Sequence, residues 1–170
     1  MFNDRYGLTQ AVLDGRKTMT RRQVPANWRL GKSRYYIGEV VAVAQSYKDA
    51  GVNPDSIVSY KDDGTPVTAI HSPGWTNKMF TRADLMPHRI QITSVRIERL
   101  QDISDEDCFR EGIRYIPEIA LYYFERADRE EGFYFNTTRE AFAALIDKVS
   151  VRGTWESNPY VVVYQFELVK

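Results

Sequence analysis

The residues best suited to chemistry lie close together near the start of the chain, in the segment Gly15-Arg16-Lys17-Thr18-Met19-Thr20-Arg21-Arg22. Its cationic and hydroxyl side chains suit an anionic ligand that accepts and donates hydrogen bonds. A lysine among arginines also suits a base, because burial and neighbouring positive charge both lower a lysine pKa. The same composition is typical of a solvent-exposed basic turn. This basic segment is the first candidate for a binding or catalytic site.

Charge is distributed unevenly along a chain that is neutral overall, with 23 Lys and Arg against 23 Asp and Glu. The first 34 residues contain eight basic and two acidic residues, whereas residues 101–131 contain ten acidic and four basic residues. This pattern predicts separate basic and acidic faces. The neutral total argues against a general binder of duplex DNA, which carries an excess of cations. Any contact with nucleic acid is therefore expected to be local.

Composition predicts one globular domain over residues 1–170, because 43% of the chain is apolar and 13% is aromatic. Cys108, His71 and His88 do not provide the usual ligands of structural zinc, so we expect no metal and no cofactor. The first residues lack the apolar run of a signal peptide, and no segment is long and apolar enough to span a membrane. We expect a cytoplasmic protein without membrane contact.

Local signals predict three helices. The apolar spacing within residues 8–14 predicts a short helix directly before the basic segment. Ser104 and the acidic residues after it predict the start of a second short helix, which Gly112 ends. Thr137 and Glu140 have the spacing of a capping box at the start of a longer amphipathic helix.

Apolar and β-branched runs predict strands at residues 40–44, 89–100 and 160–168, the first of them buried. The alternation within residues 89–100 changes phase midway, which indicates a bulge or bend and hence a curved sheet. Between residues 49 and 75, Gly, Pro, Asp and Ser accumulate around a predicted hairpin, which indicates an insertion. Strands with a few helices predict an α+β fold built on a small mixed β-barrel.

Three separated segments share their order and spacing with a known family. The first is Leu13-Asp14-Gly15-Arg16-Lys17-Thr18-Met19-Thr20-Arg21-Arg22, which is similar to the pattern Gly-x-Lys-Thr-x-Thr-x-Arg. The second runs from Val95 to Ser104 and on through Glu111-Gly112-Ile113, and the third is Trp155-Glu156-Ser157-Asn158-Pro159-Tyr160 before the last strand. Together they resemble the ASCH family, whose members are small relatives of the PUA RNA-binding fold.

The resemblance implies a PUA-like mixed β-barrel with a few short helices and a cationic cleft that binds RNA or a nucleoside-like ligand. The chain looks most like the longer phage and prophage members, with insertions near residues 49–80 and 114–135. Contacts to the ligand are expected from the basic segment and from one arginine at the start of a strand, namely from Arg16, Thr18, Arg21, Arg22 and Arg89.

Some small bacterial members of the family hydrolyse N4-acetylcytidine with a lysine, a threonine and a glutamate. These map onto Lys17, Thr20 and Glu111, so the resemblance implies a metal-independent amidohydrolase as an alternative function. Thr20 would be the nucleophile and Lys17 its base. Strand alternation places these two side chains on opposite sides, so Lys17 has to reach the site from the turn. A ribonuclease is a further alternative, for which the chain offers no histidine pair as acid and base.

Two further readings stay open. Glu111 lies near the end of its predicted helix, which suits a proton carrier, but without the resemblance it reads as an exposed glutamate paired with Arg110 or Arg114. Several aromatic residues in polar surroundings are candidates for stacking on a base, although packing in the core is the commoner role. These are Trp28, Trp75, Trp155, Tyr35 and Tyr36.

Overall fold

The structure, a computed structural model, describes residues 1–24, 33–127 and 132–169. Trp28, one of the candidate stacking residues, lies outside these ranges, as does part of the expected insertion near residues 114–135. The described residues form two compact units. The larger unit contains residues 3–39 and 91–168, and the smaller unit is built mainly from residues 40–90. The organisation as one domain with two insertions stays a prediction.

The smaller unit contains the polar stretch expected near residues 49–80. It begins with β2 (Val40–Ala42), and the predicted hairpin is present as the antiparallel pair β3 (Ile57–Tyr60) and β4 (Pro66–Thr68). Short 3-10 helices follow, namely η1 (Ala69–His71), η2 (Pro73–Trp75), η3 (Lys78–Phe80) and η4 (Ala83–Leu85). The unit has its own hydrophobic cluster, formed by Tyr47, Val58, Ala69 and Met86.

One strand differs from its prediction. The run at residues 40–44 is expected to be a buried strand, but β2 ends at Ala42 and Val40 is 46% exposed. Only Val43, which follows the strand, is buried among its β-branched residues. The apolar, β-branched run therefore predicts the presence of the strand correctly, but the prediction that the strand is buried is wrong. Composition alone does not say which neighbours cover a strand.

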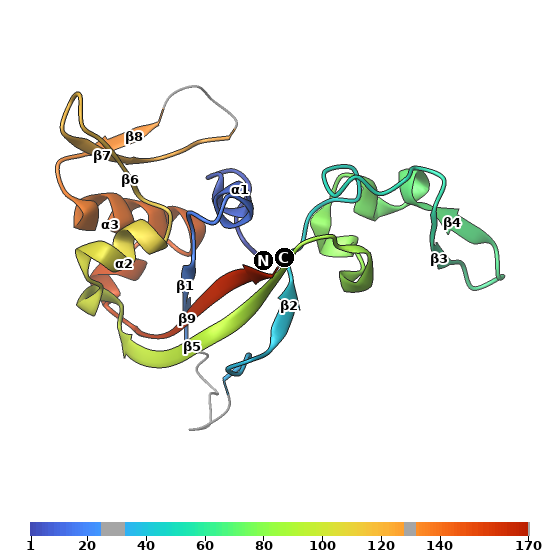
Figure 1. The fold of residues 1–170 in the computed structure, drawn as a ribbon, viewed down its shortest axis with the longest axis horizontal. Helices are drawn as coiled ribbons and strands as arrows, with labels where there is room; N and C mark the ends of the chain where they lie inside the picture. Colours follow the sequence, from blue (N-terminus) through green and yellow to red (C-terminus); the bar gives the residue numbers. More distant parts are fainter. Residues whose placement is uncertain (25–32, 128–131, 170) are drawn as a thin grey trace. The chain divides into compact units, whose positions relative to one another are not determined.

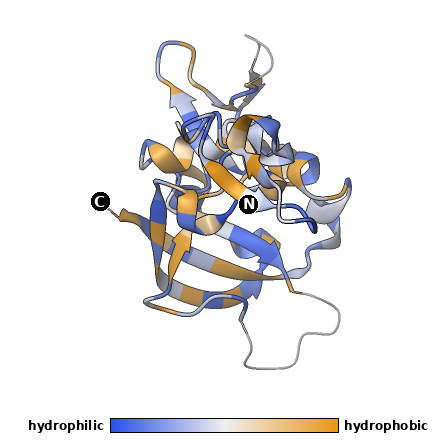
Figure 2. Cartoon of the chain, turned by 90° about the vertical axis from the view of Figure 1, so that its right-hand side faces the viewer, coloured by the Kyte–Doolittle hydropathy of each residue, from blue (hydrophilic) through white to orange (hydrophobic). Residues whose placement is uncertain are grey.

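The larger unit is organised around a curved sheet in which β1 (Met19–Gln23), β9 (Tyr160–Val169) and β5 (Arg89–Arg99) lie side by side in that order. Figure 1 shows these strands curling like half of a barrel. β1 runs antiparallel to β9, with Arg21 opposite Val163. Figure 2 shows hydrophobic and hydrophilic residues alternating in bands along the long strands. Together with the short helices, this sheet confirms the predicted α+β class.

Three helices of the larger unit begin where the sequence signals place them, namely α1 (Leu8–Leu13), α2 (Asp105–Arg110) and α3 (Thr138–Val149). Two further short helices have no counterpart in the sequence predictions, namely η5 (Leu100–Asp102) and α4 (Thr154–Ser157). The Ser104 hydroxyl accepts a hydrogen bond from the Asp107 N–H at the start of α2. Thr137 and Glu140 form the predicted capping box at the start of α3. α3 packs against both α2 and α4.

A second, small sheet occupies the expected insertion near residues 114–135. It consists of β6 (Arg114–Ile116), β7 (Leu121–Phe124) and β8 (Phe133–Phe135), paired antiparallel in that order. Phe124 is fully buried, with its ring centroid 4.9 Å from that of Phe133 and 5.8 Å from that of Phe135. β7 and β8 pack against α3, so this sheet is part of the larger unit's packing.

Candidate functional site

The structure brings together two of the three candidate catalytic residues. The Lys17 ammonium Nζ donates a hydrogen bond to Glu111 Oε2 at 2.6 Å and another to the Glu111 backbone oxygen at 2.8 Å. The Lys17 and Glu111 side chains are 2% and 6% exposed. The reading of Glu111 as an exposed helix-end glutamate is therefore wrong, because its carboxylate lies in the interior beside a residue of the basic segment.

Backbone hydrogen bonds explain how the chain delivers Lys17 to this position. Gly15, with φ +73°, turns the chain after α1, and the Lys17 N–H then donates to the Ala11 oxygen. The Thr18 N–H donates to the Arg110 oxygen, so the chain leaves α1 across the C-terminal end of α2. A cation is favourable there because the last carbonyl groups of a helix lack partners within it.

Arg21 is buried in the same place. Its guanidinium Nη2 donates to Glu98 at 2.6 Å and to Asp107 at 2.7 Å, and its Nη1 donates to Glu111 Oε1 at 3.1 Å. Arg96 extends the network, because it donates to Glu98 at 2.8 Å and to Asp107 at 2.5 Å. We call this group the ion cluster; its members are Lys17, Arg21, Arg96, Glu98, Asp107 and Glu111.

The ion cluster contains three cations and three carboxylates, so its formal charges cancel. It joins β1 and the turn before it to β5 and to α2, which contributes Asp107 and its C-cap residue Glu111. It also removes Lys17 and Arg21 from the expected basic face, because both side chains lie in the interior; separate faces of exposed charge stay a prediction. Cations of the first 34 residues pair directly with Asp107 and Glu111 from the acidic stretch, because a buried charge without a partner is too costly.

Burial has the largest influence on the pKa of Lys17 and lowers it. The carboxylate of Glu111 acts in the opposite direction, while Arg22 and Arg21 add to the lowering. A lowered lysine pKa is what a base requires. The ammonium is nonetheless almost completely covered and is held by Glu111 at two points, so this geometry describes a packed pair rather than an open reaction centre.

Thr20, the candidate nucleophile, is not brought to the Lys17–Glu111 pair. It lies on β1 directly before Arg21, and its side chain is partly buried. Successive side chains of a strand point to opposite faces, so the Thr20 hydroxyl faces away from the side on which Arg21 meets Glu111. The structure thus unites the lysine and the glutamate and separates both from the threonine.

The candidate ligand-binding residues have different environments. Arg16 pairs with Asp14 at 2.9 Å near the surface. Thr18 fixes the backbone, since its oxygen also accepts a hydrogen bond from the Phe166 N–H. Arg21 is committed to the ion cluster, whereas Arg22 is exposed. Arg89 is exposed and belongs to the smaller unit, and its role at a binding site stays a prediction.

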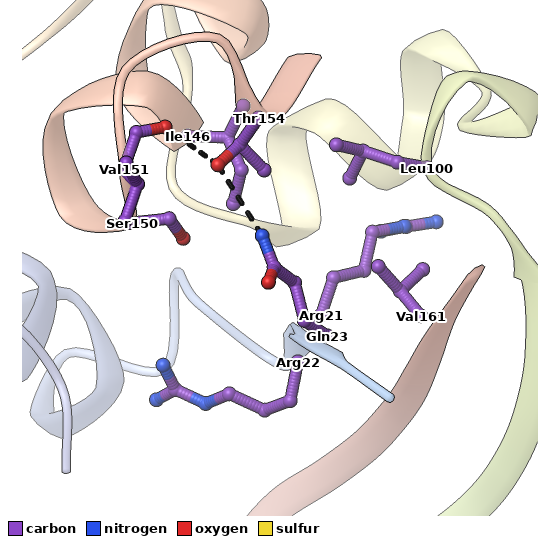
Figure 3. A pocket seen from close by; sticks show the side chains of 9 residues that line it. All are labelled: Arg21, Arg22, Gln23, Leu100, Ile146, Ser150, Val151, Thr154 and Val161. Atoms are coloured by element: carbon purple, nitrogen blue, oxygen red, sulfur yellow. Dashed lines mark hydrogen bonds between the residues drawn. The ribbon is translucent and has the colours of Figure 1, made fainter. Parts of the chain in front are cut away.

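A pocket of about 240 Å³ lies at the end of β1, and Figure 3 shows it from close by. We call it the Gln23 pocket. Buried side chains form its floor, namely Leu100, Ile146, Thr154 and Val161. Exposed residues form its rim, namely Arg22, Gln23, Ser150 and Val151, and Arg21 also lines it. An apolar floor with a few polar groups at the rim is the usual character of a small-molecule site.

Two hydrogen bonds organise the wall of the Gln23 pocket. The Gln23 amide Nε2 donates to the Thr154 hydroxyl at 3.3 Å, and that hydroxyl donates to the Val151 backbone oxygen at 2.5 Å. Figure 3 shows both bonds converging on Thr154. Sequence reasoning missed Gln23, Ser150 and Thr154, because the latter two approach β1 only through the packing of α3 and α4. Only the place of Gln23 directly after the basic segment could have suggested it.

The candidate stacking residues mostly pack within the protein. Trp155 lies edge-on to Phe142, with centroids 6.1 Å apart, and the Arg139 guanidinium lies 5.1 Å from its ring centroid. Tyr35 lies edge-on to Tyr164 at 5.4 Å. Trp75 packs against the hydrophobic cluster of the smaller unit. Tyr36, in contrast, is 69% exposed.

Within the described ranges, no group of three or more His, Cys, Asp or Glu side chains has an arrangement that could hold a metal ion. In the same ranges, no helix has both the length and the apolar character needed to cross a membrane.

Comparison with known proteins finds a similarity in structure but none in sequence. No protein-family model and no curated protein matches the sequence. Among solved structures, the chain is similar to the high-resolution crystal structure of the ASCH domain from Lactobacillus crispatus JV V101. The TM-score is 0.39 and the sequence identity 14%, and the match covers 99% of this chain and 76% of that chain. That protein belongs to the family that the three sequence segments resemble.

Proposed function

We propose that this chain is an ASCH-type, PUA-like domain that binds RNA or a nucleoside-like ligand, and that the ligand enters the Gln23 pocket. The resemblance of three separated segments to the ASCH family supports the general function. The position of the pocket supports the location, because its rim begins with Arg22, the exposed last residue of the basic segment.

One observation carries the proposal: the exposed residue Arg22 lies at the rim of a mostly apolar pocket whose rim also carries the polar side chains of Gln23 and Ser150. An unpaired nucleotide presents the matching groups, since it has a flat apolar base face, polar base edges and an anionic phosphate. Arg22 can contact phosphate through two N–H groups at once. On the pocket floor, Ile146 is 8% exposed and offers an apolar surface to the base, with Leu100 and Val161 packed beneath it.

Fluorescence anisotropy with a labelled single-stranded RNA of mixed sequence tests this proposal. Affinity should fall as salt rises, because binding to phosphate releases counterions. Arg22→Ala should weaken binding about tenfold or more, the effect of losing a charged hydrogen bond. Lys61→Ala is a control that removes one positive charge from the exposed turn of the β3–β4 hairpin. The proposal would be contradicted if both substitutions weakened RNA binding equally, or if the affinity did not depend on salt concentration.

A second candidate is the amidohydrolase, which the contact between Lys17 and Glu111 favours. Release of acetate from N4-acetylcytidine is the assay. Replacing Lys17 or Glu111 disturbs the ion cluster as well as any chemistry, so Thr20→Ala is the sharper variant, because Thr20 faces away from that cluster. Turnover that disappears in a folded Thr20→Ala protein supports hydrolysis with Thr20 as the nucleophile. Absence of turnover by the wild type would contradict hydrolysis, and turnover unchanged in Thr20→Ala would exclude Thr20 as the nucleophile.

A further inference from the structure

The hydrogen bonds around Thr154 fix which way the Gln23 amide faces. A threonine hydroxyl has one proton and can accept with its lone pairs. The Thr154 proton is given to the Val151 oxygen at 2.5 Å, so towards Gln23 this hydroxyl acts as an acceptor. The amide group that meets Thr154 must therefore be the NH₂ donor. These two hydrogen bonds therefore direct the carbonyl oxygen Oε1 of Gln23 away from Thr154.

That oxygen is available to a ligand. Gln23 is exposed at the rim of the pocket, and among the described residues its Oε1 accepts no hydrogen bond. Figure 3 shows Oε1 on the side of the amide that is turned away from Thr154. The rim thus presents an acceptor whose orientation is held by a buried residue, since Thr154 is 4% exposed. A fixed acceptor selects for donors and disfavours other acceptors.

We propose that Gln23, oriented by Thr154, makes the pocket selective for nucleobases that carry an exocyclic amine at the contacted edge. This inference rests on the proposed function. Cytosine and adenine present an amine where uracil and hypoxanthine present a carbonyl oxygen. The amine donates to Oε1, whereas the carbonyl places two acceptors against each other. Gln23 is therefore a specificity-determining residue that touches the base, and Thr154 is a positioning residue that acts through Gln23.

Competition binding with unlabelled single-stranded octamers tests the inference, using cytidine against uridine oligomers and adenosine against inosine oligomers. The wild-type protein should prefer the amine-bearing oligomer of each pair about tenfold, as expected for a pocket that leaves one polar contact unmade. Gln23→Leu should abolish the preference while the salt dependence of binding remains. Gln10→Leu is a control, because it makes the same change at an exposed position on α1.

Thr154→Val tests the positioning role. This variant keeps the shape of the side chain and removes the acceptor that fixes the amide, so selectivity should fall towards that of Gln23→Leu, with affinity for the uridine oligomer preserved. Equal binding of both members of each pair by the wild type, or a preference that survives Gln23→Leu, would overturn the inference and leave the proposed function standing. Failure of every oligomer to bind would overturn the proposed function and this inference with it.

Discussion

Glu111 binds Lys17 with one carboxylate oxygen and Arg21 with the other, although Lys17 lies 94 positions and Arg21 lies 90 positions earlier in the chain. A single carboxylate thus pairs with two buried cations from the basic segment, and Arg21 receives further compensation from Glu98 and Asp107. This relationship fixes β1 against α2. It also explains why Arg21 is unavailable to a ligand while its neighbour Arg22 is exposed.

Replacing Glu111 by Gln should destabilise the protein by about 3–5 kcal/mol, because two buried cations lose a shared carboxylate. Urea unfolding followed by circular dichroism measures the change. Glu106→Gln is the matched control, since Glu106 pairs with Arg110 on the same helix but its side chain is 73% exposed. That control should cost less than about 1 kcal/mol. Similar losses for the two variants would show that burial of the cluster has no energetic consequence.

Cys108 should resist alkylation as long as the protein is folded. Its side chain is buried in α2, and burial raises the pKa of the thiol to about 12, so almost no thiolate exists at pH 8. Iodoacetamide labelling followed by mass spectrometry should be slow without urea and fast above the unfolding midpoint. Labelling at the same rate in both conditions would contradict this expectation.

The same thiol gives a pH dependence of defined sign. The unfolded thiol loses its proton near its ordinary pKa of 9.0, whereas the folded thiol keeps it up to about pH 12. Between these values the folded state binds more protons, so this contribution to stability is complete below pH 9 and falls as the pH rises. The stability difference between the wild type and Cys108→Ala should therefore shrink from pH 8.5 to pH 10.5. A constant difference would contradict the pKa shift.

Gly112→Ala should destabilise the protein by about 1–3 kcal/mol, because Gly112 has φ +110° at the end of α2 and a methyl group there would lie 3.3 Å from Leu8 Cδ2. Gly64→Ala separates the two causes. Gly64 also has a positive φ, of +81°, but an added methyl group meets no atom within 4 Å. Thermal unfolding should show a larger loss for Gly112→Ala, and equal losses would assign the whole effect to backbone conformation.

Thr137→Ala should cost about 1 kcal/mol, since Thr137 accepts the hydrogen bond of the Glu140 N–H in the capping box of α3. Thr137→Ser retains the hydroxyl and should recover most of that stability. Chemical unfolding of the two variants side by side gives the comparison. A serine variant as unstable as the alanine variant would mean that the methyl group, and not the cap, is what matters.

The parts of the fold that were predictable from the sequence are those whose signals are local. Ser104 and Thr137 cap helices through atoms three residues away, and Gly112 ends α2 where its position suggests. The strands β5 and β9 follow from their apolar runs for the same reason. In these places the residues that decide the structure are neighbours in the chain.

The parts that were not predictable depend on partners far apart in the chain. The position of Glu111 at the end of its helix predicts an exposed residue. Its carboxylate is buried because ion pairs with Lys17 and Arg21 offset the cost of removing it from water. The β6–β7–β8 sheet consists of strands of three or four residues, too short for a clear alternation. The family resemblance located Lys17 and Glu111 together but also grouped Thr20 with them, and strand geometry separates it.

On β1, the Arg21 side chain points inward and the Arg22 side chain points outward, so the length of the preceding turn decides which arginine is buried. If one residue were deleted between Gly15 and Met19, every side chain of β1 would change sides. One residue inserted in the same turn would bring Thr20 to the position that Arg21 occupies, and Glu98, Asp107 and Glu111 would then lose this guanidinium. Variants with insertions or deletions in this turn should therefore be absent from any functional library, even where substitutions at the same positions survive.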